Sequence, residues 1–376
     1  MSRTFLIILV STILFLSCKE ESHKPSVMFG QADTQKEATA YDLEDIQASG
    51  ELIAATLSSP ETYYEYRGEG FGVEYEMAKS FASHIGARLR VEVVQDSAEL
   101  MHKLTSGEAD LVLTVPKWQI RPSSPQLTSA LSAWWQDDLR ERTQLAERQR
   151  LAPRNRIRRL SRPPMLSREK GIICSYDGLF QRYASVAGMD WRLMAAQCYQ
   201  ESAFDPKAVS WAGAQGLMQI MPGTAAHLGL AASAVYEPAQ NIAAAARYLA
   251  ELQVTFSDIH ERTERLCFVL AAYNGGASHV RDAMALAQQY GGNPHRWNDV
   301  DKYILLLSQP RYYRDPVVRA GYLRGSETSD YVRQIMARWS QYRGVAHPAP
   351  LVPQKENYKR NTRIRSREEF LNDSIP

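Results

Sequence analysis

Cysteine is scarce in this chain, with 4 among 376 residues, and neither sign of charge dominates, since 44 Lys and Arg face 42 Asp and Glu. This even balance gives no reason to expect nucleic-acid binding. No Cys and His spacing typical of a metal site occurs, so we expect neither a metal nor a cofactor. Apart from Cys18, the cysteines are Cys174, Cys198 and Cys267. Because Cys198 and Cys267 lie in apolar helical runs, we expect buried free thiols rather than a disulfide.

Long apolar runs are also rare, and the one at the start, from Phe5 to Leu16, is too short to span a membrane as a helix. It follows Arg3 and ends at Ser17-Cys18, which is typical of a signal peptide. A small residue directly before a cysteine resembles a bacterial lipobox, in which the cysteine is diacylated. We therefore expect a signal peptide over residues 1–17 and lipidation of Cys18. An uncleaved anchor, or a plain signal peptide with a chance cysteine, is the alternative.

Residues 18–40 are polar and show no hydrophobic periodicity, which is typical of a flexible tether. Together with a lipidated Cys18, such a tether predicts a protein anchored in the outer membrane, on its periplasmic face. The charged residues directly after Cys18 also resemble a surface-export signal, so exposure on the outer surface is the alternative.

Alternating strands and helices are predicted over residues 41–151. Strands are expected at 51–57, 88–94 and 110–115, with helices at 73–85 and 97–104. This β-α-β-α-β order predicts a parallel sheet with crossover helices. It resembles the first lobe of the solute-binding proteins that bind amino acids. Residues 130–136 and a helix at 137–149 match the return segment of that lobe, so the second lobe is missing. We therefore expect a structural or protein-docking half-domain that does not bind free amino acids.

Arginine and proline crowd the next segment, residues 152–171, which predicts a basic, extended linker. A solvated linker is favoured over one that lies on anionic lipid or on acidic wall polymer. At the other end of the chain, residues 346–376 are rich in proline and charge, and we expect them to be disordered.

The segment from Met189 to Pro222 contains the candidate catalytic residue. Asp190 is a good N-cap, and the helix that it begins is apolar on nearly every side, which predicts a buried helix. Glu201 closes this helix. Burial and the negative end of the helix dipole both favour the protonated form of a carboxyl group there, so Glu201 is a candidate general acid. An ordinary exposed glutamate in the last turn is the alternative.

Two further stretches have the composition of the same cleft. Gly213, Gly216 and Pro222 surround the short apolar run Leu217–Ile220, which is typical of a tight loop that lets the backbone approach a ligand. Another helical run ends in Tyr273 and Asn274, which places an aromatic ring and an amide at a helix C-terminus. Further helices are predicted at 223–228, 239–256, 261–274, 277–290, 300–308 and 329–342, with glycines 229, 275 and 291 as C-caps.

These motifs together resemble the soluble-lytic-transglycosylase-like family of lysozyme-fold enzymes over about residues 175–342. The residues that carry the resemblance are Glu201-Ser202, Gly216-Leu217-Met218-Gln219, Ala272-Tyr273-Asn274, and Glu327-Thr328 with Tyr331. The resemblance implies an all-α, lysozyme-like domain over residues 172–345. With the N-terminal α/β half-domain, it predicts an α+β chain overall.

The resemblance also implies a function and a role for each motif residue. Peptidoglycan glycan strands would be the substrate, cleaved without water, and Glu201 would act as acid and then as base. Ser202, Gln219 and Asn274 would orient the N-acetyl group and the reacting sugar. Met218 and Tyr273 would shape the subsites, Glu327 would lie in the groove wall, and Tyr331 would support Glu201. A goose-type hydrolase of the same bond and a non-catalytic peptidoglycan-binding lipoprotein remain the alternatives, and no protein partner is indicated.

The anchor can be tested directly. Cys18→Ala removes the cysteine that the predicted lipobox would acylate. Stable anchoring requires two acyl chains or more, so the variant should lose its anchor. We expect the variant to move from the membrane fraction to the soluble fraction on ultracentrifugation, with Cys267→Ala as the control that stays behind. A Cys18→Ala protein that still sediments with membranes contradicts the lipobox.

Overall fold

The computed structural model describes residues 41–151 and 163–344. The predicted signal peptide, Cys18, the tether, the first part of the basic linker and the C-terminal tail lie outside the described residues. Within them the fold is mixed and rich in helix.

A four-stranded sheet forms the centre of the N-terminal region, residues 41–151. Its order is β4 (Arg88–Val94), β1 (Glu51–Leu57), β5 (Leu111–Leu113) and β6 (Gln119–Ile120). The first three strands are parallel, and β6 pairs antiparallel with β5. Parallel neighbours need crossover connections, which α2 (Val73–His84) and α3 (Ser97–Ser106) provide. The predicted β-α-β-α-β order and the parallel sheet are therefore confirmed.

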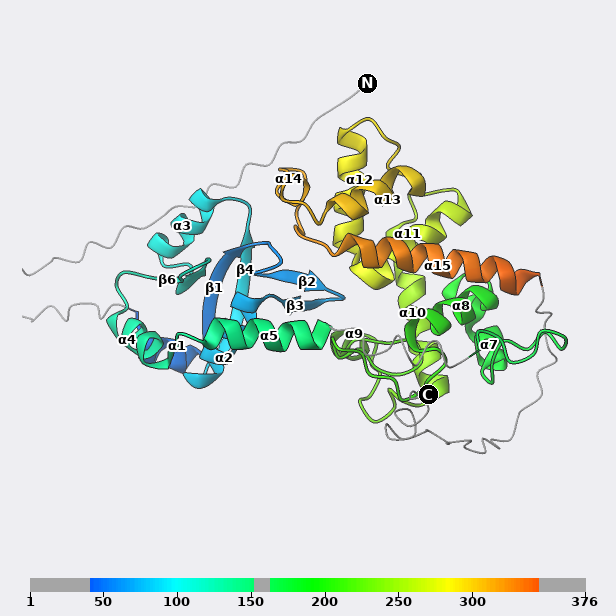
Figure 1. The fold of residues 1–376 in the computed structure, drawn as a ribbon, viewed down its shortest axis with the longest axis horizontal. Helices are drawn as coiled ribbons and strands as arrows, with labels where there is room; N and C mark the ends of the chain where they lie inside the picture. The colour runs from blue at the N-terminus through cyan, green and yellow to red at the C-terminus, as the bar shows by residue number, and fades with distance from the viewer. Residues whose placement is uncertain (1–40, 152–162, 345–376) are drawn as a thin grey trace, which may run out of the picture. The chain divides into compact units, whose positions relative to one another are not determined.

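Helices cover both faces of this sheet (Figure 1). Because side chains alternate along a strand, Leu52 and Ala54 of β1 face one side and Ala55 faces the other. The first side packs against α1 (Leu43–Ser49), α2 and α4 (Pro125–Trp134), and the second packs against α3. A further helix, α5 (Leu139–Leu151), packs along α2. Residues 130–136 therefore belong mainly to the end of α4, and the helix expected at 137–149 is α5.

A short hairpin in this region was not predicted from the sequence. It consists of β2 (Tyr64–Tyr66) and β3 (Glu69–Phe71), joined by Arg67 and Gly68. Both turn residues have positive φ, 54° and 80°, as a type I′ turn requires. The hairpin escaped prediction because each strand has three residues and because the turn lacks the usual Asn-Gly or Asp-Gly pair.

The region from residue 163 to 344 is built of helices. They are α7 (Asp177–Ala187), α8 (Trp191–Ser202), α9 (Pro222–His227), α10 (Pro238–Thr255), α11 (Arg262–Gly275), α12 (Ala277–Gln289), α13 (Trp297–Leu306), α14 (Pro310–Tyr313) and α15 (Gly325–Arg343). The helices predicted between residues 223 and 342 are confirmed, with ends shifted by a few residues. Residues 163–171, expected to be linker, include a turn in which Ser167 and Ile172 pair, and Met165 packs against the helical core.

Helix α8 runs through the core of this helical region. The side chain of Asp190 caps its first turn, and every residue from Leu193 to Glu201 is buried. It packs against α7 and α15. The prediction of a buried helix with a buried Glu201 in its last turn is therefore confirmed, although the helix ends one residue later, at Ser202.

One of the three predicted glycine caps is displaced by a residue. Gly229 and Gly291 have left-handed φ values of 66° and 82°, as expected of helix ends. Gly275 is instead the last residue of α11, and Gly276, with φ 93°, caps the helix. A Cβ on Gly275 would lie 2.8 Å from the hydroxyl oxygen of Thr328, so this glycine lets α11 and α15 approach closely.

The cysteines in the described residues are free. Cys174, Cys198 and Cys267 are all buried, which confirms the prediction of buried thiols for the last two. Burial raises the pKa of the Cys267 thiol to about 12, so it stays protonated and inert. No cluster of His, Cys, Asp and Glu in residues 41–151 and 163–344 could hold a metal ion. Over the same residues, no helix has the length and apolar character needed to cross a membrane.

The contact between α13 and α15 gives a test of the helical packing. A Cβ on Gly325, the first residue of α15, would overlap the carbonyl oxygen of Ile304. Because both groups belong to the backbone, Gly325→Ala must shift a helix, and we expect it to lower the free energy of unfolding by about 1–3 kcal/mol.

Gly178→Ala is the matched control, because nothing lies within 4 Å of a Cβ added there, near the start of α7. Alanine in that helical position should leave stability unchanged or raise it by about 0.5–1 kcal/mol. Urea unfolding followed by circular dichroism measures both variants. Equal stability of the two would show that α13 and α15 do not meet as described.

Candidate active site

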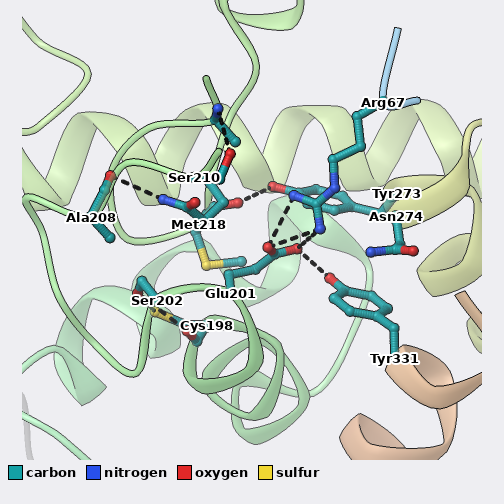
Figure 2. A network of polar contacts seen from close by, with 12 residues as sticks. Arg67, Cys198, Glu201, Ser202, Ala208, Ser210, Met218, Tyr273, Asn274 and Tyr331 are labelled. Atoms are coloured by element: carbon teal, nitrogen blue, oxygen red, sulfur yellow. Dashed lines mark hydrogen bonds and ion pairs between the residues drawn. The ribbon is translucent and has the colours of Figure 1, made fainter. Parts of the chain in front are cut away.

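The carboxylate of Glu201 lies at the centre of a polar network (Figure 2). Glu201 is buried, with 5% of the residue's surface exposed. The hydroxyl of Tyr331, on α15, donates a hydrogen bond of 2.6 Å to Oε1. The guanidinium of Arg67, from the hairpin β2–β3, approaches both carboxylate oxygens: Nη1 and Nη2 lie 3.1 Å from Oε2, and Nη2 lies 3.3 Å from Oε1.

Burial and charge fix the protonation of the two partners. Burial, reinforced by the negative charge of Glu201, raises the pKa of Tyr331 well above its ordinary value, so its hydroxyl remains a donor. Burial opposes the positive charge of Arg67, but the carboxylate of Glu201 outweighs burial and holds the pKa of Arg67 above its ordinary value. The guanidinium of Arg67 is a cationic partner of Glu201 that was not predicted from the sequence. That Glu201 is protonated when it acts as an acid stays a prediction.

A tight loop lies beside Glu201, as the glycines around Leu217–Ile220 predicted. Gln215 and Ile220 pair across it, and two of its residues have positive φ, 79° at Gly216 and 50° at Gln219. A Cβ on Gly216 would lie 2.5 Å from the carbonyl oxygen of Val235 and would overlap the amide of Asn241. Glycine is therefore required at 216 both for backbone conformation and for close approach.

Asn241 braces this loop and was missed from the sequence. Its Oδ1 accepts a hydrogen bond of 2.8 Å from the backbone N–H of Met218. Its Nδ2 donates to the carbonyl oxygens of Val235, at 2.8 Å, and of Gln215, at 3.2 Å. The signal that could have found it is an asparagine in the first turn of the apolar run that forms α10, where a fully buried amide needs partners.

Tyr273 and Asn274 connect the end of α11 to the neighbouring elements. The hydroxyl of Tyr273 donates to the carbonyl oxygen of Met218 at 2.8 Å, which ties the loop to α11. Asn274 accepts a hydrogen bond of 2.9 Å from the hydroxyl of Thr328, which ties α11 to α15. The sequence-predicted residues Met218, Tyr273, Asn274 and Tyr331 therefore gather around Glu201 (Figure 2).

In three other predicted site residues, the polar side-chain groups form hydrogen bonds or an ion pair with other parts of the protein. Ser202 donates to the carbonyl oxygen of Cys198, at 3.3 Å, inside α8. The amide nitrogen of Gln219 donates to the carbonyl oxygens of Ala208, at 3.0 Å, and Gly216, at 2.8 Å, so this side chain holds the loop. Glu327 forms an ion pair of 2.6 Å with Arg324. Contacts of these side chains with a sugar remain predictions.

Trp211 is a further aromatic residue near the site that was not predicted. It belongs to the loop between α8 and the 216–220 turn, and Tyr66 of the hairpin stacks on it with 5.4 Å between ring centroids and an interplanar angle of 19°. The guanidinium of Arg324 lies 5.7 Å from the Trp211 ring centroid. A tryptophan within a segment of small residues is the signal that could have found it.

Comparisons with known proteins give a family match for part of the helical region. Residues 178–295 match the family model of the transglycosylase SLT domain. The chain is 42% identical to a membrane-bound lytic murein transglycosylase F from Desulfosudis oleivorans over 158 residues, which are 42% of this chain and 34% of that relative. It is 29% identical to the protein of the same name from Salmonella arizonae over 412 aligned positions, which cover 77% of this chain and 79% of that relative.

Among solved structures, the chain is similar to the 70 kDa soluble lytic transglycosylase of Escherichia coli. The identity is 29% and the TM-score 0.33, and the match covers 45% of this chain and 24% of that one. A lytic transglycosylase from Pseudomonas aeruginosa gives 23% identity and a TM-score of 0.32, with 46% and 25% of the two chains covered. Glu201, Met218 and Tyr273 fall inside the matched SLT domain, whereas Arg67 and Tyr331 lie outside it.

The brace at Asn241 gives a test of how the loop is held. Asn241→Ala leaves the N–H of Met218 and two buried carbonyl groups without this partner, and each unsatisfied buried group costs about 1–3 kcal/mol. We expect lower stability on urea unfolding and faster hydrogen exchange at the Met218 amide. Gln240→Ala, at the exposed neighbouring residue, should change neither. Unaltered protection of Met218 in Asn241→Ala would show that the amide does not hold the loop.

Proposed function

We propose that this chain is a lytic transglycosylase that cleaves the bond between N-acetylmuramic acid and N-acetylglucosamine in peptidoglycan without water. The observation that carries the proposal is a buried carboxylate at the end of α8 whose side-chain partners are a tyrosine and an arginine rather than a second carboxylate. The match of residues 178–295 to the SLT domain and the two lytic transglycosylases of similar sequence support it.

A single carboxylate restricts the chemistry. Most glycosidases use two carboxyl groups, about 5 Å apart for retention and about 6.5–9.5 Å apart for inversion, and the second acts as nucleophile or activates water. The other acidic residue of the motif set, Glu327, is instead paired with Arg324. The nucleophile must then come from the substrate. N-acetylmuramic acid offers its acetamide oxygen, which stabilises a cation at C1, and its own C6 hydroxyl.

The steps balance without a water molecule. Protonated Glu201 gives its proton to the glycosidic oxygen as the bond from C1 to that oxygen breaks. The C6 hydroxyl then attacks C1, and the Glu201 carboxylate accepts the proton released from that hydroxyl. Glu201 ends protonated, ready for another turnover, and the product carries a 1,6-anhydro ring on N-acetylmuramic acid.

The neighbouring residues have supporting roles in this proposal. Tyr331 holds one oxygen of Glu201 and so orients the other toward the substrate. Asn274 and Ser202 orient the N-acetyl group and the reacting sugar, and Gln219 acts with them by holding its loop. Met218 and Tyr273, joined by a hydrogen bond, shape the subsites, and Glu327 lies in the groove wall.

For the rest of the chain we propose the segments and domains that were predicted from the sequence. A signal peptide and a lipidated Cys18 would anchor the enzyme in the outer membrane, and residues 41–151 would form one lobe of a solute-binding-like domain. The alignment with the Salmonella relative supports a missing lobe, because its 412 positions exceed the whole chain of 376 residues while covering 77% of it. The relative therefore carries a long stretch that this chain lacks. A basic linker and a C-terminal SLT domain would complete the enzyme.

The products distinguish this function from the two alternatives. Purified protein should release muropeptides with anhydro ends, which are one water lighter than hydrolysis products and resist borohydride reduction. A goose-type hydrolase would give reducible N-acetylmuramic acid ends. A non-catalytic binding protein would sediment with purified cell-wall sacculi and release nothing.

Glu201→Gln tests the residue that carries the mechanism. Loss of the general acid and base should lower the rate of muropeptide release by on the order of a hundredfold to ten-thousandfold. Binding to sacculi should persist, because glutamine keeps the shape of the side chain. Glu251→Gln, on the surface of α10, is the control and should keep full activity. If Glu201→Gln retained most of the activity, Glu201 would not be the acid.

A further inference from the structure

We propose that the C-terminal end of α12 carries a second binding site for peptidoglycan, in which a sugar ring stacks on Tyr290 and stem-peptide carboxylates pair with Lys302 and Arg311. The proposal rests on the proposed function for its choice of ligand, but the site lies apart from the catalytic residues. Helix α12 begins shortly after Asn274 in the chain, and its 13 residues place Tyr290 about 20 Å away along the helix axis.

A cluster of three tyrosines forms this site, and we call it the tyrosine platform. Tyr290 has the largest exposed fraction, 45%, of any Phe, Trp or Tyr in residues 41–151 and 163–344. One face of its ring lies on Tyr303 of α13, with 5.8 Å between ring centroids and 12° between ring planes. Tyr312 of α14 packs edge-on against both rings, 6.0 and 6.4 Å away. Helices α12, α13 and α14 therefore meet at one aromatic surface (Figure 1).

The platform is held in place from beneath and at its edge. Tyr303 is 5% exposed and belongs to the core of the helical region. The hydroxyl of Tyr290 donates to Oδ2 of Asp315 at 3.3 Å, and Nε2 of Gln289 donates to the same oxygen at 2.9 Å. The other oxygen of Asp315 accepts from the backbone N–H of Val317 at 3.1 Å. Because the Tyr290 ring is already ordered, a ligand that covers its outer face pays little for immobilising it.

The outer face of Tyr290 has the chemistry that a pyranose ring recognises. An aromatic ring carries negative charge density on its face, and the axial C–H groups of a sugar carry partial positive charge. One such contact is weak. A glycan strand in an insoluble wall repeats the same sugars many times, so a weak second site raises the effective concentration of substrate at the cleft.

Two cations flank the platform and add a preference for anionic ligands. Nζ of Lys302 lies 5.1 Å from the ring centroid of Tyr303, and Cζ of Arg311 lies 5.6 Å from that of Tyr312. Both cations are exposed, and neither pairs with a carboxylate in the part of the chain that the structure describes. The stem peptides of peptidoglycan carry free carboxylates. Charge complementarity therefore favours glycan that bears peptides over bare glycan.

The test measures sedimentation of detergent-solubilised full-length protein with purified sacculi. All variants carry Glu201→Gln, so that the sacculi stay intact. Tyr290→Ala should weaken binding about tenfold, whereas Tyr290→Phe should bind as the parent does because the ring remains. Tyr41→Ala is the matched control, because it removes a tyrosine of similar exposure, 42%, from the N-terminal region, and it should also bind as the parent does.

A second variant tests the cations at exposed positions without altering the packing of the platform. The parent should bind intact sacculi about tenfold more tightly than glycan from which an amidase has removed the stem peptides. Lys302→Gln combined with Arg311→Gln should bind the two ligands equally, whereas Tyr290→Ala should lose affinity for both. If Tyr290→Ala were unfolded in a thermal scan, the comparison of the two ligands would decide alone.

The outcomes separate the second site from the catalytic proposal. Parent-like binding by Tyr290→Ala and by the double variant would overturn the second site, and so would the absence of binding by every protein. Anhydro products from wild type, with binding that ignores both changes, would leave the transglycosylase intact and refute the second site alone. Binding that depends on Tyr290, without any product from wild type, would support the second site and refute the activity.

Discussion

The side chain of Glu201 is 3% exposed at the end of a helix whose dipole disfavours negative charge there, and the groups around it are arranged accordingly. Tyr331 reaches it from α15, and Arg67 reaches it from the hairpin β2–β3. Beside it, the backbone of Met218 donates to Asn241 and accepts from the hydroxyl of Tyr273. The hydroxyl of Thr328 donates to the side chain of Asn274. A buried carboxylate must be protonated or paired with a cation, and Arg67 is the cation beside Glu201 in this structure.

The sequence was sufficient to predict features that depend on local pattern. Continuous apolar character predicted the burial of α8 with Glu201 at its end, and alternation of strands and helices predicted the parallel sheet. It could not predict the contact of Arg67 with Glu201, because nothing in a three-residue strand or an Arg-Gly turn indicates a partner so distant in the chain. Nor did it predict that Asn241 and Gln219 use their amides to hold a loop. Such contacts depend on tertiary arrangement, which side-chain type alone does not specify.

Digestion of sacculi in water enriched in heavy oxygen tests the central claim most directly. In the proposed reaction the carboxylate of Glu201 regains its proton from the C6 hydroxyl of the substrate, so water is not a reactant. Mass spectrometry of the released muropeptides should therefore find no heavy oxygen at C1 of N-acetylmuramic acid. Incorporation of heavy oxygen at that carbon would show that water is the nucleophile, and the account of a water-free reaction at Glu201 would be wrong.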